Sequence, residues 1–288
     1  MFAPNEKDFD VVERLATGKV WRMKKWPVRS PFFFFATIAT DVDGAPKAYA
    51  RLHPNIDPTL TIHSTLDNLA NAGSPGNWAG VVVDHAGNPI EQDGRTPAQP
   101  ERGYMISQTT LSANNFPSER DVRHWVDATK IPYIALPSKR QQFKATGLTP
   151  GDSALVINPT TGRFCFAVYA DSKKFQNRAG EMSLRAAELI GYPGLDGRSG
   201  PPGNPLAFTI VFPASGLGQG TIPSEDGLGY NARRDFINFS IKDRYDLFFD
   251  AFQAYPVLQQ ALTFAGYIRF RLLGKEGLPT ILDGGTVL

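Results

Sequence analysis

The chain has 288 residues, of which 42% are hydrophobic and 20% charged, and this composition suits a globular protein with a core of its own. The formal net charge is +2, and the 30 Lys and Arg residues are scattered, so no basic stripe indicates a nucleic-acid partner. No apolar run is long enough to span a membrane, and the charged N-terminus lacks the apolar centre of a secretory signal peptide.

The predicted elements are mostly short strands. Twenty-seven Gly, 23 Pro and 20 Phe indicate many strands and turns and argue against a helical bundle. The first element is an exception, because Phe9, Val12 and Leu15 predict one side of an amphipathic helix over 5–16 that ends at Gly18. Seven strands are predicted after it, and they indicate a β-barrel or sandwich: 32–40, 80–84, 103–109, 131–138, 153–159, 163–170 and 207–213.

Two further segments are predicted outside these strands. Residues 192–205 are rich in Gly and Pro, which predicts a loop that lines a cleft. Residues 244–266 show helical spacing interrupted at Pro256, which predicts two helices. Since apolar helices usually bury one face on their own domain, we expect this pair to pack there, although docking of another chain is the alternative.

The candidate catalytic residues are Asp171 and Glu181, ten residues apart. The apolar run 164–170 predicts a buried strand that Asp171 closes, and 182–190 predicts a helix with Glu181 in its first turn. Two acids across a short loop can face one cleft in different environments, which is what a glycosidase requires. The structural alternative is that Glu181 complements the helix dipole and Asp171 caps a turn.

Other catalytic chemistries find little support in the sequence. Cys165 lies within an apolar run and is predicted to be a buried core thiol. The four histidines lack the spacing of zinc ligands. Residues 41–49 begin like a calcium-binding loop but lack its later acidic positions, so Asp41 and Asp43 are candidates for binding sugar hydroxyl or amino groups. No metal and no cofactor is predicted.

Six segments occur in the order seen in a known family. They resemble fungal-type chitosanases, glycoside hydrolase family 75, over about residues 36–216: 41–49, 66–73, 127–138, 168–171, 180–191 and 208–216. The resemblance implies a compact six-stranded, double-psi-like β-barrel with loops around a cleft. It also implies an inverting endo-hydrolase of chitosan, a β-1,4-linked glucosamine polymer, with Glu181 as the acid and Asp171 as the base.

The resemblance also implies substrate-binding residues. Asp41, Asp43 and Lys130 match positions in the cleft, and Ser183 either orients Glu181 or serves the end of the helix. The chain departs from the family in lacking a signal peptide and in a shorter loop between the two acids. Secretion is therefore expected only by analogy or by a route that needs no signal, unless the protein acts in the cytoplasm or the sequence omits a signal.

We therefore expect an α+β, mainly β protein that acts on a polysaccharide. Its predicted parts are an N-terminal helical extension (1–30), a chitosanase-like hydrolase domain (31–220) and a C-terminal helical tail packed on that domain (221–288). A chain that is slightly basic suits polycationic chitosan poorly, because an opposite local potential concentrates a charged substrate. Hydrolysis of peptidoglycan glycan strands, including by a protein delivered to another cell, is therefore an alternative. A non-catalytic carbohydrate-binding protein is another.

Overall fold

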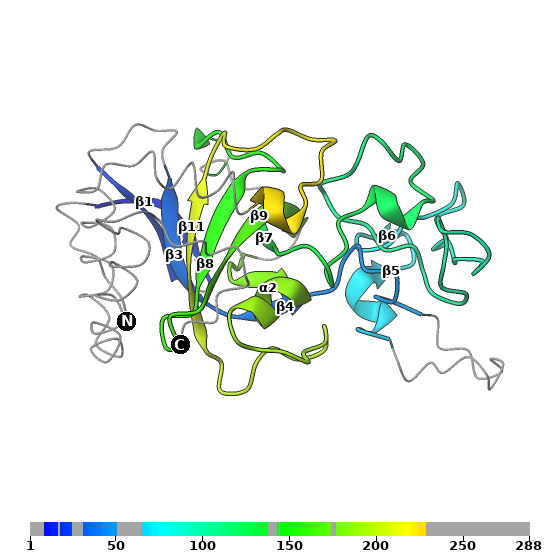
Figure 1. Ribbon diagram of the computed structural model, residues 1–288, viewed down its shortest axis with the longest axis horizontal. Helices are drawn as coiled ribbons and strands as arrows, with labels where there is room; N and C mark the ends of the chain where they lie inside the picture. The colour runs from blue at the N-terminus through cyan, green and yellow to red at the C-terminus, as the bar shows by residue number, and fades with distance from the viewer. Residues whose placement is uncertain are drawn as a thin grey trace.

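The computed structural model describes residues 9–16, 18–24, 31–50, 65–137, 143, 145–173 and 177–228. These residues form a large curled sheet with few helices (Figure 1), so the prediction of a mainly β, α+β protein is confirmed. The elements that bear on the site are, in chain order, β1 (Phe9–Leu15), β2 (Gly18–Met23), β3 (Phe32–Thr37), β4 (Ala39–Asp41), η2 (Leu69–Ala72), β5 (Gly73–Ser74), β6 (Asn77–Trp78), η3 (Val122–His124), β7 (Tyr133–Pro137), β8 (Ser153–Ile157), β9 (Phe164–Lys173), β10 (Glu181–Ser183), α2 (Leu184–Leu189) and β11 (Leu206–Phe212).

The sheet combines antiparallel and parallel pairs. Within the described residues it holds nine strands in the order β1-β2-β3-β11-β8-β9-β7-β10-β4, while β5 and β6 form a separate ribbon. Most neighbours are antiparallel, but β7 runs parallel to β9, and β10 runs parallel to β4. The strand β7 therefore has β9 on one side and β10 on the other, which brings two distant parts of the chain together.

The strand β3 explains why the sheet has an apolar interior on both faces. Phe32 and Phe34 belong to a cluster that includes residues of α2, so this helix covers one face. On the other side, the rings of Phe33 and Phe9 lie 5.5 Å apart, and those of Phe35 and Phe208 lie 4.6 Å apart. A strand covered on both faces needs no polar alternation, which accounts for four consecutive phenylalanines.

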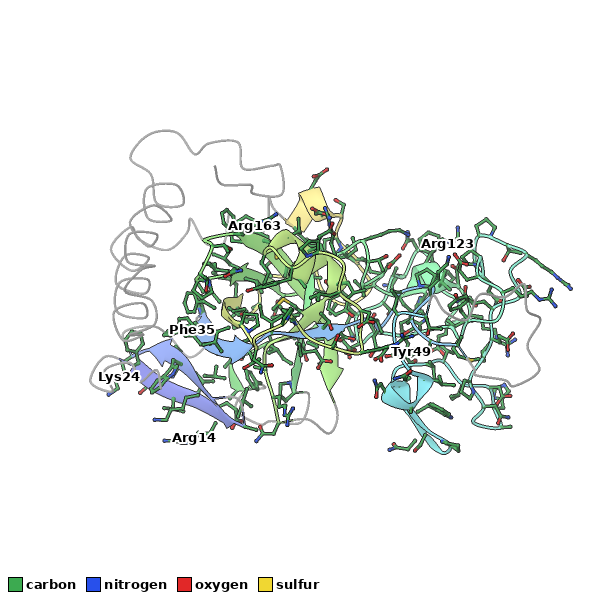
Figure 2. The ribbon with its side chains drawn as sticks, turned by 90° about the horizontal axis from the view of Figure 1, so that it is seen from below. Arg14, Lys24, Phe35, Tyr49, Arg123 and Arg163 are labelled. Carbon is green, nitrogen blue, oxygen red and sulfur yellow. The ribbon has the colours of Figure 1, made fainter. Side chains whose placement is uncertain are left out.

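Residues 65–126 form a loop-rich region beside the sheet (Figure 1). Figure 2, seen from a perpendicular direction, shows Tyr49 at the boundary between the sheet and this region, and Arg14 and Lys24 at the opposite end of the molecule from Arg123. The strands predicted at 80–84 and 103–109 are wrong, because these segments make only isolated bridges. Val81 and Val82 are buried in two different apolar clusters, and this burial explains their apolar run without a strand.

The predicted N-terminal helix is also wrong over the residues that the structure describes. Phe9–Leu15 form β1, which pairs with β2 in an antiparallel hairpin. A bulge between Val11 and Glu13 shifts the register of this hairpin, and Val12, which the helix prediction grouped with Phe9 and Leu15, lies at the bulge. The adjacent Val11 and Val12 favour a strand at this point, because β-branched residues pack well on a pleated surface.

The remaining predicted strands are confirmed in type. Residues 32–40 form β3 and most of β4. The segments 131–138 and 153–159 contain β7 and β8, while 163–170 and 207–213 overlap with most of β9 and β11. The helices predicted at 244–266 lie outside the described residues.

Ser183 joins three elements through its side chain. Its hydroxyl oxygen accepts hydrogen bonds from the backbone N–H of Tyr133 and Ala186, at 3.0 and 3.1 Å, and donates to the carbonyl oxygen of Ile131 at 2.9 Å. Ser183 is thus the N-cap of α2, and it is fully buried. These bonds connect the start of β7 to the end of β10 and so determine where β10 lies.

We expect Ser183→Ala to lower the free energy of unfolding by about 1–3 kcal/mol, because two buried N–H groups lose their acceptor. Denaturant titration of the purified protein measures this change. The matched control is Ser74→Ala, at an exposed position of β5, which should unfold like the wild type. Equal stability of the two variants would contradict the role given to Ser183.

Candidate functional site

The sheet brings the two predicted catalytic acids to neighbouring strands. Ala135 of β7 is opposite Asp171 of β9 on one side and opposite Glu181 of β10 on the other. Since strands in a sheet are spaced by about 4.8 Å, the Cα atoms of the two acids lie about 10 Å apart. Residues directly opposite each other project on the same face of a sheet. Asp171 and Glu181 therefore project from the same face of the sheet, two strands apart.

The local structure around both acids differs from the prediction. The strand β9 continues to Lys173, so Asp171 lies within the strand and does not close it. Glu181 is the first residue of β10 and does not belong to the helix, which begins at Leu184. The reason is that Ser183 serves as the N-cap, while Glu181 pairs with β4 and β7.

Three buried carboxylates form the centre of the site. Asp41 at the end of β4, Asp43 in the turn after it and Asp171 are 3%, 5% and 6% exposed. One carboxylate oxygen from each lies within 4.8 Å of the other two. The sequence predicted that each of these acids lies in the cleft, and the structure brings them together from positions 130 residues apart in the chain.

Neutral donors hold this acidic cluster in place. The Oδ1 atom of Asp43 accepts a hydrogen bond from the hydroxyl of Tyr49 at 2.7 Å. The backbone N–H of Asp43 donates to Oδ1 of Asp41 at 3.0 Å. The Oδ1 atom of Asp171 accepts from the backbone N–H and the hydroxyl of Thr110, at 3.0 and 3.2 Å. These bonds determine how the carboxylates are oriented.

The cluster also acts on a buried tyrosine. The hydroxyl of Tyr133 donates a hydrogen bond of 3.0 Å to the backbone carbonyl of Asp43. Burial raises the pKa of Tyr133 well above its ordinary value, and the nearby charges of Asp41, Asp43 and Asp171 raise it further. Tyr133 therefore stays a neutral donor beneath the acids.

Close carboxylates of like charge favour a cationic ligand between them. Two unit charges about 4 Å apart repel by about 4 kcal/mol at an effective dielectric constant near 20. An ammonium group would relieve this repulsion, and so would a divalent cation such as Ca²⁺ or Mg²⁺, which prefers carboxylate oxygens. Among the described residues, Asp41, Asp43 and Asp171 are the group with the geometry for a metal. The expectation that the protein needs no metal ion stays a prediction.

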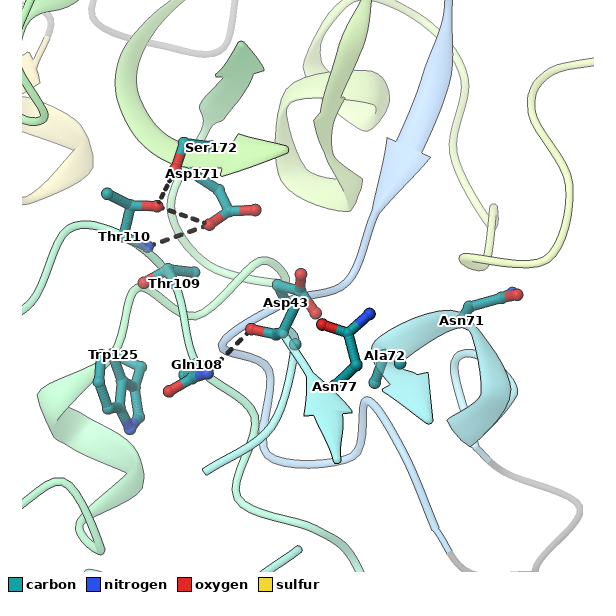
Figure 3. A pocket seen from close by; sticks show the side chains of 13 residues that line it. Asp43, Asn71, Ala72, Asn77, Gln108, Thr109, Thr110, Trp125, Asp171 and Ser172 are labelled. Atoms are coloured by element: carbon teal, nitrogen blue, oxygen red, sulfur yellow. Dashed lines mark hydrogen bonds between the residues drawn. The ribbon is translucent and has the colours of Figure 1, made fainter. Parts of the chain in front are cut away.

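Two cavities adjoin this cluster. The first, cavity A, has a volume of about 340 Å³ and is lined by Asp43, Asn71, Ala72, Gly73, Asn77, Ala79, Gly80, Gln108, Thr109, Thr110, Trp125, Asp171 and Ser172. Trp125 lies at one end of it and Asn71 at the other (Figure 3). Among the described residues that line cavity A, none is Lys, Arg or His. It therefore combines two carboxylates, an aromatic ring and uncharged amide and hydroxyl groups.

The second cavity, cavity B, is larger and has mixed charge. Its volume is about 550 Å³, and its lining includes the acids Asp41, Asp67 and Glu181 together with Arg178 and Arg198. Part of the lining comes from residues 197–200 and 204, so the prediction that the loop 192–205 lines a cleft is confirmed. Asn71 lines both cavities, which shows where they adjoin.

Asp67 gives cavity B an acid in a different environment from the others. Burial raises the pKa of the Asp67 carboxyl, hydrogen bonds from the Asn68 backbone and the Asn71 side chain oppose this shift, and the charge of Asp196 adds to it. Acids of one site with different environments can divide proton donation and acceptance between them. The sequence did not single out Asp67.

Two predicted substrate-binding residues do not line either cavity. Lys130 has a side chain that is 74% exposed and pairs with Asp127 at 2.9 Å. The hydroxyl of Ser183 lies in the interior and bonds to three backbone groups, so the expectation that it serves the helix end is the one that the structure supports. Both residues were predicted from their positions in a sequence motif, and a motif does not show where a side chain lies.

The residues that sequence reasoning missed are Asp67, Asn71 and Trp125. Asp67 and Asn71 fall in the segment 66–73, which was recognised only as a motif. Trp125 follows a short 3-10 helix, and nothing in its sequence neighbourhood sets it apart from a core tryptophan. Cys165 is buried as predicted, and its burial raises the pKa of the thiol, so it stays protonated.

Two glycines let the backbone approach closely beside the acids. Gly44 has a φ of 80°, and a Cβ atom there would overlap the carbonyl oxygen of Val126. Gly180 has a φ of 97°, and a Cβ atom there would overlap the carbonyl oxygen of Thr37. Since Gly44 follows Asp43 and Gly180 precedes Glu181, both close approaches determine where these acids lie.

We expect Gly44→Ala to destabilise the protein by about 1–3 kcal/mol more than Gly87→Ala does, because only Gly44 faces an atom that a methyl group would overlap. Gly87 is a matched control, since its φ is 81° and nothing lies within 4 Å of its Cβ position. Strain at positive φ is therefore the same in both variants. Denaturant titration compares them, and equal losses would show that the approach to Val126 is unimportant.

Comparisons with known proteins do not decide the family. No model of a known protein family matches the chain, and no curated protein matches it either. In the part of the chain that the structure describes, no helix is long and apolar enough to cross a membrane. The resemblance to fungal-type chitosanases stays a prediction that rests on the six segments of the sequence.

Proposed function

We propose that the protein is an inverting glycoside hydrolase that cleaves a β-linked amino-sugar polymer of the chitosan type. The observation that carries this proposal is the position of Asp171 and Glu181 opposite the same residue of β7, with Asp171 in the lining of cavity A and Glu181 in the lining of the adjoining cavity B. Inversion uses two carboxyl groups about 6.5–9.5 Å apart, with room for a water molecule. A Cα separation of about 10 Å is compatible with that range.

In the proposed reaction, Glu181 donates its proton to the leaving glycosidic oxygen as the bond to the anomeric carbon breaks. Asp171 accepts a proton from a water molecule, whose oxygen bonds to the anomeric carbon from the opposite face. The two carboxyl groups exchange protonation states in each turnover, and solvent restores them. Thr110 holds the Asp171 carboxylate in one orientation through two hydrogen bonds.

The lining of cavity A supports an amino sugar as ligand. Carboxylates form charge-assisted hydrogen bonds with ammonium groups, and an aromatic face attracts a cation. Asp43, Asp171 and Trp125 provide these groups in a cavity whose described lining has no cationic side chain. The net charge of +2 is therefore no objection to a polycationic substrate, since the cleft itself is acidic.

The finer fold that belongs to this proposal is a six-stranded, double-psi-like barrel within the larger sheet.

Peptidoglycan is the second candidate, and the observation that favours it is the pair of arginines in cavity B. Arg178 and Arg198 line this cavity beside Glu181. Guanidinium groups pair well with carboxylates, which the stem peptides of peptidoglycan carry. The same two acids would then cleave the glycan strand.

Replacing Glu181 by Gln should lower turnover by about 10²–10⁴-fold, because the proton donor is lost while the shape is kept. New reducing ends from chitosan of several acetylation levels and from purified sacculi measure the activity, with and without EDTA. Glu188→Gln is the control, since Glu188 lies nearby in α2, is half exposed and lines neither cavity.

Each outcome of this assay distinguishes a candidate. Loss of chitosan cleavage in Glu181→Gln alone supports the first proposal, and loss of sacculus cleavage supports the second. The anomeric form of the fresh reducing end, followed by NMR, tests inversion. A fully active Glu181→Gln protein would refute the role of this residue, and binding without cleavage by the wild type would favour a carbohydrate-binding protein.

We further expect Asp43→Asn to raise the KM for deacetylated oligosaccharides about tenfold, since a hydrogen bond to a charged group contributes about 1.5–3 kcal/mol. The KM for fully acetylated oligosaccharides should change little, because they carry no ammonium group. Asp93→Asn is the control at an exposed position outside both cavities. An equal effect of Asp43→Asn on both substrates would contradict ammonium binding in cavity A.

A further inference from the structure

Asn71 occupies a special place between the two cavities. It belongs to the 3-10 turn η2, where its backbone N–H donates to the carbonyl oxygen of Asn68 at 2.9 Å. Asn71 is exposed, and it belongs to the lining of both cavity A and cavity B. Figure 3 shows it at the end of cavity A that is remote from Trp125. Among the described residues, Asn71 is the one that both linings share, so a ligand that spans the two cavities would lie beside it.

Asp67 determines which way the amide of Asn71 points. The Nδ2 atom of Asn71 donates a hydrogen bond of 2.8 Å to Oδ1 of Asp67. The reverse orientation would place the amide oxygen against a carboxylate oxygen, and neither atom can donate, so the bond determines the orientation. The carbonyl oxygen Oδ1 of Asn71 is therefore turned away from Asp67 and is available as an acceptor.

Asp67 is itself held on several sides. It is 6% exposed, its Oδ1 accepts a second hydrogen bond from the Asn68 backbone at 2.7 Å, and its own N–H donates to Ala48 at 2.9 Å. The preceding residue, Leu66, accepts a hydrogen bond of 2.8 Å from the backbone of Gly197 in the loop of cavity B. A carboxylate that is fixed by these hydrogen bonds can orient an amide at the surface.

We propose that Asn71 binds the saccharide where the two cavities join, with its Oδ1 accepting a hydrogen bond from a sugar hydroxyl or ammonium group, and that Asp67 is the residue that positions it. This inference rests on the proposed function, since it names the residue that guides the polymer past the acids. An acceptor there suits both kinds of donor that a glucosamine unit carries. The pair thus connects the ammonium-binding cavity A to the cavity that contains Glu181.

The test measures binding of glucosamine oligosaccharides by calorimetry in the Glu181→Gln protein, which binds without turnover. Asn71→Ala should weaken binding about tenfold, the usual value of one hydrogen bond. Asn68→Ala is the matched control in the same turn, because Asn68 is exposed and lines neither cavity, and it should bind as the parent does. Unchanged binding by Asn71→Ala would overturn the inference.

A double-mutant cycle tests the positioning role of Asp67. Asp67→Ala should weaken binding as Asn71→Ala does, and the two changes together should weaken it no further, because Asp67 acts through Asn71. Additive losses would mean that Asp67 acts in another way. If Asp67→Ala does not fold, Asp67→Asn replaces it, since this variant keeps the shape of the side chain but can present either its oxygen or its nitrogen to Asn71, so the orientation of Asn71 is no longer determined. Unchanged binding by this variant would overturn the positioning role.

Failure of this inference differs from failure of the proposed function. If the wild type cleaves the polymer and Glu181→Gln does not, while Asn71→Ala binds normally, only the role of Asn71 is wrong. If the protein neither binds nor cleaves any of the oligosaccharides, both proposals are overturned together.

Discussion

The pairing of β7 with both β9 and β10 is the constraint on which the site depends. Backbone hydrogen bonds hold the two neighbouring strands at a fixed spacing from β7, so the separation of Asp171 and Glu181 does not depend on the loop between them. Ser183 secures the same arrangement from the side of β10 by bonding to the start of β7. The two acids are thereby held on rigid elements, which is what catalysis by a pair of carboxyl groups requires.

The carboxylates of the acidic cluster are stabilised by hydrogen bonds from donors in other parts of the chain. Tyr49 and Thr110 donate to Asp43 and Asp171, and both donors come from loops beside the sheet. Close carboxylates at the mouth of a cavity still favour a cation, and this preference connects the electrostatics of the site to its proposed substrate. A chain with a small positive net charge can therefore present an acidic cleft.

The predictions that failed did so where local pattern and tertiary pairing disagree. Phe9, Val12 and Leu15 recur at a spacing of three, as in a helix, and a bulge at Val12 accommodates this spacing within the strand β1. The run that includes Val81 and Val82 is apolar because these two side chains are buried in two different apolar clusters, and its described pairings are isolated bridges. Glu181 lies before the helix because Ser183 takes the N-cap position. Each error concerns a pairing that only distant residues decide.

The sequence alone determined the mainly β class, the strands from apolar runs such as that of β9, and the residue types of the site, including Asp41, Asp43, Asp171 and Glu181. These features follow from local composition, since apolar runs bury and carboxylates bind donors. Only the tertiary structure decided that three of these acids meet, that Lys130 points elsewhere, and that Asp67, Asn71 and Trp125 belong to the cavities. The reason is that strand order and loop packing bring together residues far apart in the chain, and no local pattern contains that information.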